Sequence, residues 1–238
     1  MKKKRQMAQI VPLSETAHRK IKNLIVTTQI GPGEQIDESQ LAETLSIGRT
    51  PIREALFRLA AENLVDVVRG RGFFVRDITL HDIRDLFEAM LIMERSAAVL
   101  AAKRIQSEEV DNLQQINDEL KKRWSEKDLL KVTLLNSRFH RAIYKAADNA
   151  FLYAYLDNLQ TLSQRLAYIC FSRKTSDYDI ESHAGLAIKD HQLIIDAFRQ
   201  RDEAQAVKTM TEHVKLFNRR VNRFTSPPIE EFEAVKPL

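Results

Sequence analysis

Cysteine, glycine and proline are all scarce in this chain of 238 residues, and each scarcity excludes a class of protein. The single cysteine, Cys170, cannot form an internal disulfide, so nothing ties the fold to an oxidising compartment. There are only 6 glycines and 6 prolines, against 44% hydrophobic and 29% charged residues. This composition excludes disordered and collagen-like chains and indicates a folded, mainly helical protein.

Long apolar runs are also missing. The longest uninterrupted run covers residues 97–102, far short of the roughly 20 residues that a membrane-spanning helix needs. The basic start, residues 1–5, is typical of the first part of a signal peptide, but polar residues and Pro12 interrupt the apolar stretch that should follow. We therefore expect a cytoplasmic protein that does not bind a membrane.

The net charge is only +4, but it is unevenly distributed. Residues 1–76 contain 13 Lys and Arg against 8 Asp and Glu, whereas the remainder contains 24 against 25. A positively charged first part and a nearly neutral second part are expected when the first part binds a polyanion. Residues 2–5 alone could equally form a solubilising tail. The other basic residues lie within periodic segments, which a tail does not explain.

The first part has the pattern of three short helices followed by a basic hairpin. These elements are predicted over residues 14–30, from Asp37, from Thr50, and over residues 64–68 and 73–75. Gly31-Pro32-Gly33 should end the first helix, Asp37 should cap the second, and Pro51 fits the first turn of the third. This succession predicts a winged helix-turn-helix, which places its third helix in the major groove of DNA.

Arg49 and Arg53 are four residues apart at the start of the third helix, so their side chains should point the same way. Arginine can bond guanine with two hydrogen bonds, and Thr50 with nearby backbone N–H groups can hold phosphates. Two arginines at this spacing more often form only a solvated helix face. The apolar residues on the opposite face and the basic turn that follows favour DNA binding instead.

Residues 41–59 resemble the signature of the GntR family of bacterial transcription regulators. Their sequence, LAETLSIGRTPIREALFRL, follows the family pattern LA-x-x-L-x-VSRTPVREAL-x-RL, and residues 70–75 match the wing ending GRG-aromatic-x-V. Two departures are Gly48, where the family usually has Ser or Thr, and Ser39, where it commonly has Arg. Each departure removes a DNA contact that the resemblance would otherwise imply.

The resemblance also implies roles for individual residues. Arg49 and Arg53 would read bases, Thr50 would hold a phosphate, and the turn after the first strand would enter the minor groove. The DNA-binding candidates are therefore Arg49, Thr50, Arg53, Arg69, Gly70 and Arg71.

From Thr79 onward every segment has the pattern of a helix. Thr79 and Asp82 form a predicted capping box at the start of the first of these helices. The helices are predicted over residues 79–105, 107–124, 127–147, 150–171, 178–200 and 202–224. The predicted organisation is a winged helix-turn-helix domain at 1–76 with a basic tail at 1–10, an all-helical domain at 77–225, and a loose tail at 226–238. The expected fold class is thus mainly α.

Three histidines of the second part lie on the apolar, core-facing sides of their helices. His140 shares a stripe with Asn136, one helical turn away, while His191 and His213 lie on stripes of two later helices. A buried imidazole without a partner costs about 1–3 kcal/mol, so each ring needs a carboxylate, a carbonyl or a metal ion. One divalent metal could serve all three rings. Ligand type alone does not identify that metal.

The all-helical part is similar to the effector domain of the FadR-like branch of the same family. In its metal-binding members an Asp and a His four residues apart join two later histidines, and the matching positions here are Asn136, His140, His191 and His213. The resemblance implies a divalent metal, zinc first with nickel or manganese as alternatives. Asn136 carries no charge, so we expect weaker binding than with the family's Asp.

The same branch mostly binds small organic or sugar acids as effectors. An Arg of the first effector-domain helix, in the setting Glu-x-Arg-x-x-x-Glu, often helps to hold them. Here Met90 occupies that position, between Glu88 and Glu94. The effector-pocket candidates are Met90, Tyr144 and Arg165.

Three functional hypotheses follow. The first is a homodimeric transcription regulator that binds a palindromic double-stranded operator under control of a small molecule. The second is a metal-dependent hydrolase tethered to nucleic acid, but the histidine stripes offer no acidic residue as general base, only Asn136. The third is a pure metal sensor. We expect the first, a transcription regulator, and do not expect an enzyme.

Overall fold

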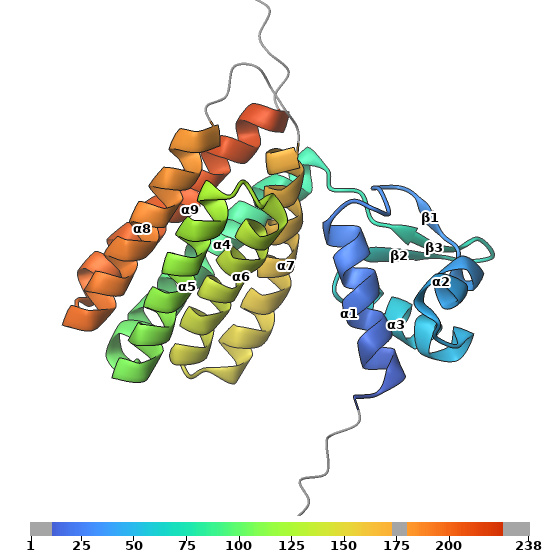
Figure 1. Ribbon diagram of the computed structural model, residues 1–238, viewed down its shortest axis with the longest axis horizontal. Helices are drawn as coiled ribbons and strands as arrows, with labels where there is room; N and C mark the ends of the chain where they lie inside the picture. Colours follow the sequence, from blue (N-terminus) through green and yellow to red (C-terminus); the bar gives the residue numbers. More distant parts are fainter. Residues whose placement is uncertain (1–10, 173–179, 226–238) are drawn as a thin grey trace, which may run out of the picture. The chain divides into compact units, whose positions relative to one another are not determined.

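The computed structural model describes residues 11–172 and 180–225 of the chain, which divides into two compact units, Met1–Ile78 and Thr79–Leu238. Figure 1 shows a small helical unit with a three-stranded sheet, and a bundle of long helices. The expected fold class, a winged helix-turn-helix followed by an all-helical domain, is confirmed. The two predicted tails, 1–10 and 226–238, lie outside the described residues.

In the first unit three helices pack on a small antiparallel sheet. The elements in chain order are α1 (Leu13–Val26), β1 (Gln35–Ile36), α2 (Glu38–Leu45), α3 (Arg49–Ala61), β2 (Val65–Val68) and β3 (Gly72–Val75). The strand order is β1-β3-β2, with Val67 opposite Phe73 and Gln35 opposite Phe74. The apolar stripes of α1 and α3 form the core, where Ile21, Ile52 and Leu56 are completely buried.

One local prediction for this unit was wrong, and one strand was not predicted. Helix α1 ends at Val26, before the Gly-Pro-Gly segment that was expected to stop it. The chain leaves the helix at Thr28, which takes a left-handed conformation with φ of 53°, and the Gln29 N–H then bonds the carbonyl of Leu24 at 2.9 Å. Strand β1 was not predicted because two residues carry no readable alternation; β3 alone defines it by pairing.

A partly buried ionic cluster ties α1 to the end of α3. His18 Nε2 lies 2.6 Å from Glu62 Oε1, and Lys22 donates to Glu62 Oε2 at 2.9 Å. Burial raises the pKa of Glu62, but these hydrogen bonds lower it more, to about 2. The charged form of Glu62 therefore stabilises this unit.

The second unit is a helical bundle. Its helices are α4 (Leu80–Arg104), α5 (Ser107–Ser125), α6 (Leu129–Ala146), α7 (Ala150–Ser172), α8 (Ile180–Gln200) and α9 (Glu203–Thr225). The predicted capping box is present, since Thr79 accepts from Asp82 N and Asp82 accepts from Thr79 N. Helix α4 packs along α9, α6 lies between α5 and α7, and α8 contacts α5 and α9 (Figure 1). None of the helices in the described ranges is long and apolar enough to span a membrane.

Candidate DNA-binding face and metal centre

The helix-turn-helix of the first unit is fixed by its caps. The Asp37 side chain accepts from the backbone N–H groups of Ser39 and Gln40, at 2.7 and 3.0 Å, so the predicted cap of α2 is confirmed. Ser46 closes α2 in a left-handed conformation, with φ of 53°. Helix α3 then begins at Arg49 with Gly48 as its N-cap, and Gly48 has no side chain to bond the first turn. The N–H groups of that turn are left for another acceptor.

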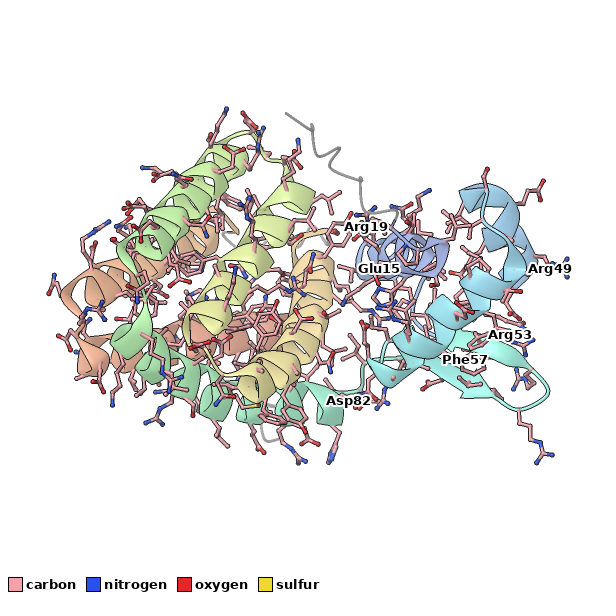
Figure 2. The ribbon with its side chains drawn as sticks, turned by 90° about the horizontal axis from the view of Figure 1, so that it is seen from below. Glu15, Arg19, Arg49, Arg53, Phe57 and Asp82 are labelled. Carbon is pink, nitrogen blue, oxygen red and sulfur yellow. The ribbon has the colours of Figure 1, made fainter. Side chains whose placement is uncertain are left out.

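Arg49, Thr50 and Arg53 are all exposed at this end of α3. Figure 2 shows Arg49, Arg53 and Phe57 along one side of the helix, while the opposite side buries Ile52 in the core. Glu38 of α2 lies 3.8 Å from the Arg53 guanidinium. A shallow surface hollow joins α2 and α3 along this side. The two arginines thus share one accessible face at a positively polarised helix end.

Phe57 is a feature of this face that the sequence reasoning missed. Its ring is 50% exposed and meets the buried ring of Phe73 edge-on, with centroids 5.2 Å apart. The spacing alone could have found it, because Arg49, Arg53 and Phe57 follow each other at four-residue intervals. An exposed aromatic ring beside arginines can contact the methyl group of thymine.

The wing carries the other basic candidates. Arg69, Gly70 and Arg71 are exposed between β2 and β3. Gly70 has φ of +74°, a conformation that favours glycine, and open space surrounds its missing side chain. Gln35 donates to the carbonyl of Arg71 at 2.8 Å, so β1 fixes the tip of the wing.

In the second unit His140, His191 and His213 come together from α6, α8 and α9. One ring nitrogen of each lies within 4.8 Å of the others. The Nε2 atoms of His140 and His213 are 3.2 Å apart. All three side chains are buried, as their stripes predict. Asn136, one turn before His140, lines the cavity beside them.

His191 is the most unusual of the three. It is completely buried, and neither ring nitrogen has a hydrogen-bond partner among the residues that the structure describes. Its ring stacks face to face on Phe139 with centroids 3.9 Å apart, so the nitrogens at the ring edge remain available to a ligand in the ring plane. Burial lowers the pKa of His191 well below its ordinary value, and neighbouring His213 and His140 lower it further. The ring is therefore neutral, as a metal ligand must be.

Burial also lowers the pKa of His213, although Asp190 partly opposes this shift. Three buried imidazoles from three helices, with one nitrogen of each converging and both His191 nitrogens unbonded among the described residues, fit a divalent cation. The burial and convergence of these nitrogens therefore suit a divalent metal ion. The residues that would hold the ion are His140, His191 and His213, with Asn136 beside them.

Two carboxylates that were not predicted from the sequence contact this histidine cluster. Glu94 of α4 is completely buried, and its Oε1 lies 3.3 Å from Nδ1 of His140. Asp190 places Oδ2 3.4 Å from Nδ1 of His213. Both carboxylates lie outside the apolar stripes that predicted the histidines, and each reaches its ring from a neighbouring helix.

A cavity of about 60 Å³ opens beside the histidines. Apolar side chains form most of its wall, while His140, His213, Asn136 and Arg220 contribute polar atoms. Of the three predicted pocket residues, Met90 lines the cavity.

Tyr144 and Arg165 are not among the lining residues. Both side chains are buried. The Tyr144 ring lies beside His140, with centroids 6.3 Å apart, and its hydroxyl donates to Glu94 and lies 3.0 Å from Oε1 of Gln160. The cationic side chain on the cavity wall is instead Arg220 of α9, whose guanidinium carbon lies 3.5 Å from the centroid of the Phe171 ring.

Both units match known protein families. The gntR family of bacterial regulatory proteins matches residues 13–75, and the FCD domain matches residues 85–216. The HTH-type transcriptional repressor GlaR of Escherichia coli K12 is 30% identical over 203 residues, covering 83% of this chain and 90% of GlaR. The transcriptional repressor RspR of the same organism is 24% identical over 212 residues, 89% of this chain and 90% of RspR.

A solved structure has the same fold. The chain of E. coli McbR/YncC superposes with a TM-score of 0.81 at 19% identity, over 91% of this chain and all of that one. At that identity the likeness concerns the fold alone.

Proposed function

The chain belongs to the GntR family of bacterial regulatory proteins, with an FCD domain, and is therefore a DNA-binding transcription regulator; from this premise we propose that a divalent metal ion and a small acid in the second unit control its binding to DNA. Its relatives are regulators rather than enzymes, so the hydrolase hypothesis is set aside. Because two of them are named repressors, we propose repression here, and a cytoplasmic location where the operator is accessible.

On the DNA side, the proposal is a homodimer on a palindromic operator. Arg49 and Arg53 read base edges in the major groove, and Thr50 with the uncapped first turn of α3 holds a phosphate. Arg69, Gly70 and Arg71 of the wing reach the adjacent minor groove. The exposure of all six residues and the open first turn of α3 support this assignment.

One observation carries the metal proposal: His191 is completely buried with both ring nitrogens unbonded, beside two further buried imidazoles. Unsatisfied polar groups at that depth are rare in native proteins and need a reason. His140, His191 and His213 would hold the ion, with Asn136 as a neutral fourth ligand. Zinc is the first choice, with nickel and manganese as alternatives, and the bound ion would supply a positive centre for an effector oxygen.

The cavity limits the size of the effector. Its volume is about 60 Å³, and one water needs about 10–15 Å³ on the same measure. A compact organic acid fits this volume better than a long one. The positive charge of Arg220 on the cavity wall suits a carboxylate, and it supplies a charge that Met90 does not.

A selection of genomic fragments with purified protein at moderate salt tests the DNA side, because nonspecific binding falls steeply as salt rises. We expect one enriched palindrome. Fluorescence anisotropy on that operator, with chelator, with zinc, and with zinc plus short-chain acids, then tests control. Arg219→Gln, an exposed neighbour, is the matched control for Arg220→Gln.

The outcomes separate the hypotheses. Operator affinity that changes with zinc and an acid together, and not in Arg220→Gln, supports the effector proposal. Affinity that follows zinc with no acid present would instead identify a pure metal sensor. Affinity unaffected by zinc in wild type would remove the metal from the proposal.

A further inference from the structure

Two of the three clustered histidines have a carboxylate at the ring nitrogen that faces away from the cluster. Glu94 Oε1 lies 3.3 Å from Nδ1 of His140, and Asp190 Oδ2 lies 3.4 Å from Nδ1 of His213. The Nε2 atoms of the same two rings are 3.2 Å apart. Among the described residues neither Nδ1 atom makes a hydrogen bond of good geometry, so these are close contacts at ion-pair distance. A carboxylate accepts hydrogen bonds and does not donate them, so it favours a ring whose proton is on Nδ1 and whose Nε2 lone pair can point inward to a cation.

We propose that Glu94 and Asp190 are positioning residues of the metal centre, which fix the ligating nitrogen of His140 and His213 and supply the negative charge that the ligands lack. This inference rests on the proposed metal site. It assigns a role to two acidic residues that lie outside the ligand set.

The position of Glu94 is itself fixed by a chain of hydrogen bonds. The Tyr144 hydroxyl donates to Glu94 Oε1 and lies 3.0 Å from Oε1 of Gln160. The Gln160 amide donates in turn to Ser137 Oγ at 3.2 Å. Helices α4, α6 and α7 thus hold one carboxylate against one imidazole. Such support limits the orientations of the His140 ring before any ion binds.

Charge gives an independent reason. Glu94 is completely buried, its Oε2 has no hydrogen-bond partner, and the ion pair that the described residues offer it is with His140. A buried carboxylate is costly in a protein interior unless a partner of opposite charge lies near it. A divalent ion on the far side of the His140 ring would be such a partner, and Asp190 stands in the same relation to the His213 ring.

Zinc affinity of the full-length chain, measured by competition with a chromogenic chelator, tests the proposal. Glu94→Gln and Asp190→Asn keep the shape of the side chain and remove its charge. Loss of such an outer partner typically weakens metal binding about 10–100-fold, and we expect that range for each variant. Glu88→Gln on exposed α4 surface and Asp196→Asn on α8 are the matched controls, which should bind zinc like wild type.

A second measurement reports the ring nitrogens directly. In the zinc-loaded chain labelled with ¹⁵N-histidine, His140 and His213 should each show a protonated Nδ1 and a metal-bound Nε2. Glu94→Gln should move the Nδ1 signal of His140 while leaving that of His213 in place. Were Glu94→Gln to fail to fold, Tyr144→Phe, which frees Glu94 from its donor but keeps the charge, should weaken zinc binding less than Asp190→Asn does.

The outcomes are distinct. A wild-type chain that takes up no zinc, nickel or manganese would remove the proposed metal centre itself. Wild-type zinc binding matched by both Glu94→Gln and Asp190→Asn would overturn the positioning role and leave the metal centre standing. A proton on Nε2 of His140 or His213 in the zinc-loaded protein would also overturn it.

Discussion

Replacing His191 with leucine should stabilise the metal-free protein, although it removes a candidate ligand. The His191 ring is completely buried and neither nitrogen is bonded. A buried polar group without a partner costs about 1–3 kcal/mol, and leucine is an apolar side chain of similar size. Since 1 kcal/mol corresponds to about 2–4 °C for a chain of this length, metal-free His191→Leu should melt about 2–12 °C above wild type.

Zinc should reverse that order. An ion that binds only the folded state stabilises it by about 2.7 kcal/mol at 100 times its Kd. Wild type has three imidazoles to hold the ion, whereas the variant has two, so the variant gains less. Calorimetric melts of both proteins, each with chelator and with zinc, measure the two shifts. His81→Leu, at an exposed histidine of α4, is the control and should leave the zinc response unchanged.

A metal-free His191→Leu protein that melts below wild type, with native circular dichroism, would refute this reasoning. It would mean that the stacking of His191 on Phe139 outweighs its two unbonded nitrogens. His191→Ala serves as the comparison, because a cavity destabilises whether or not the ring is satisfied. Without metal, the melting temperature should therefore rise in His191→Leu and fall in His191→Ala.

Three further predictions concern the first unit. Arg49→Ala should weaken operator binding by about 1–3 kcal/mol in a mobility-shift assay, with an unchanged melting curve because the side chain is exposed. Arg71→Ala should lower the slope of log K against log salt by about 1 and weaken all DNA sequences alike. Glu62 has its pKa lowered from 4.5 to about 2, so its contribution is complete above pH 4.5 and is lost as the pH falls toward 2. Urea titrations across that range should show this loss in wild type and not in Glu62→Gln.

Local periodicity predicted most of the fold. Apolar spacing and capping residues such as Asp37 and Thr79 placed the helices to within a few residues, because both signals act within one or two turns. Local periodicity failed where backbone conformation or long-range pairing determines where an element begins or ends. A left-handed residue, Thr28, ends α1, and the pairing partner β3 alone defines β1.

The candidate site was likewise predictable only in part. The stripes predicted that His140, His191 and His213 face the core, because the helical period fixes the side of a helix on which a residue lies. The period does not say which helices face each other. Asp190 illustrates this point: it immediately precedes His191 in the sequence, yet its carboxylate contacts His213 of α9. Local pattern cannot supply such pairings.

The placement of Glu94 and Met90 on α4 bears on how a ligand in the bundle could influence DNA binding. Only four residues separate β3 of the wing from the start of α4, so α4 is the covalent continuation of the DNA-binding unit. Met90 lines the cavity and Glu94 contacts His140, so α4 is also part of the site. A ligand shifts the operator affinity only by its difference in affinity for two states of the protein. On the proposed function, we expect those two states to differ in how α4 packs against α6 and α9, which carry His140 and His213.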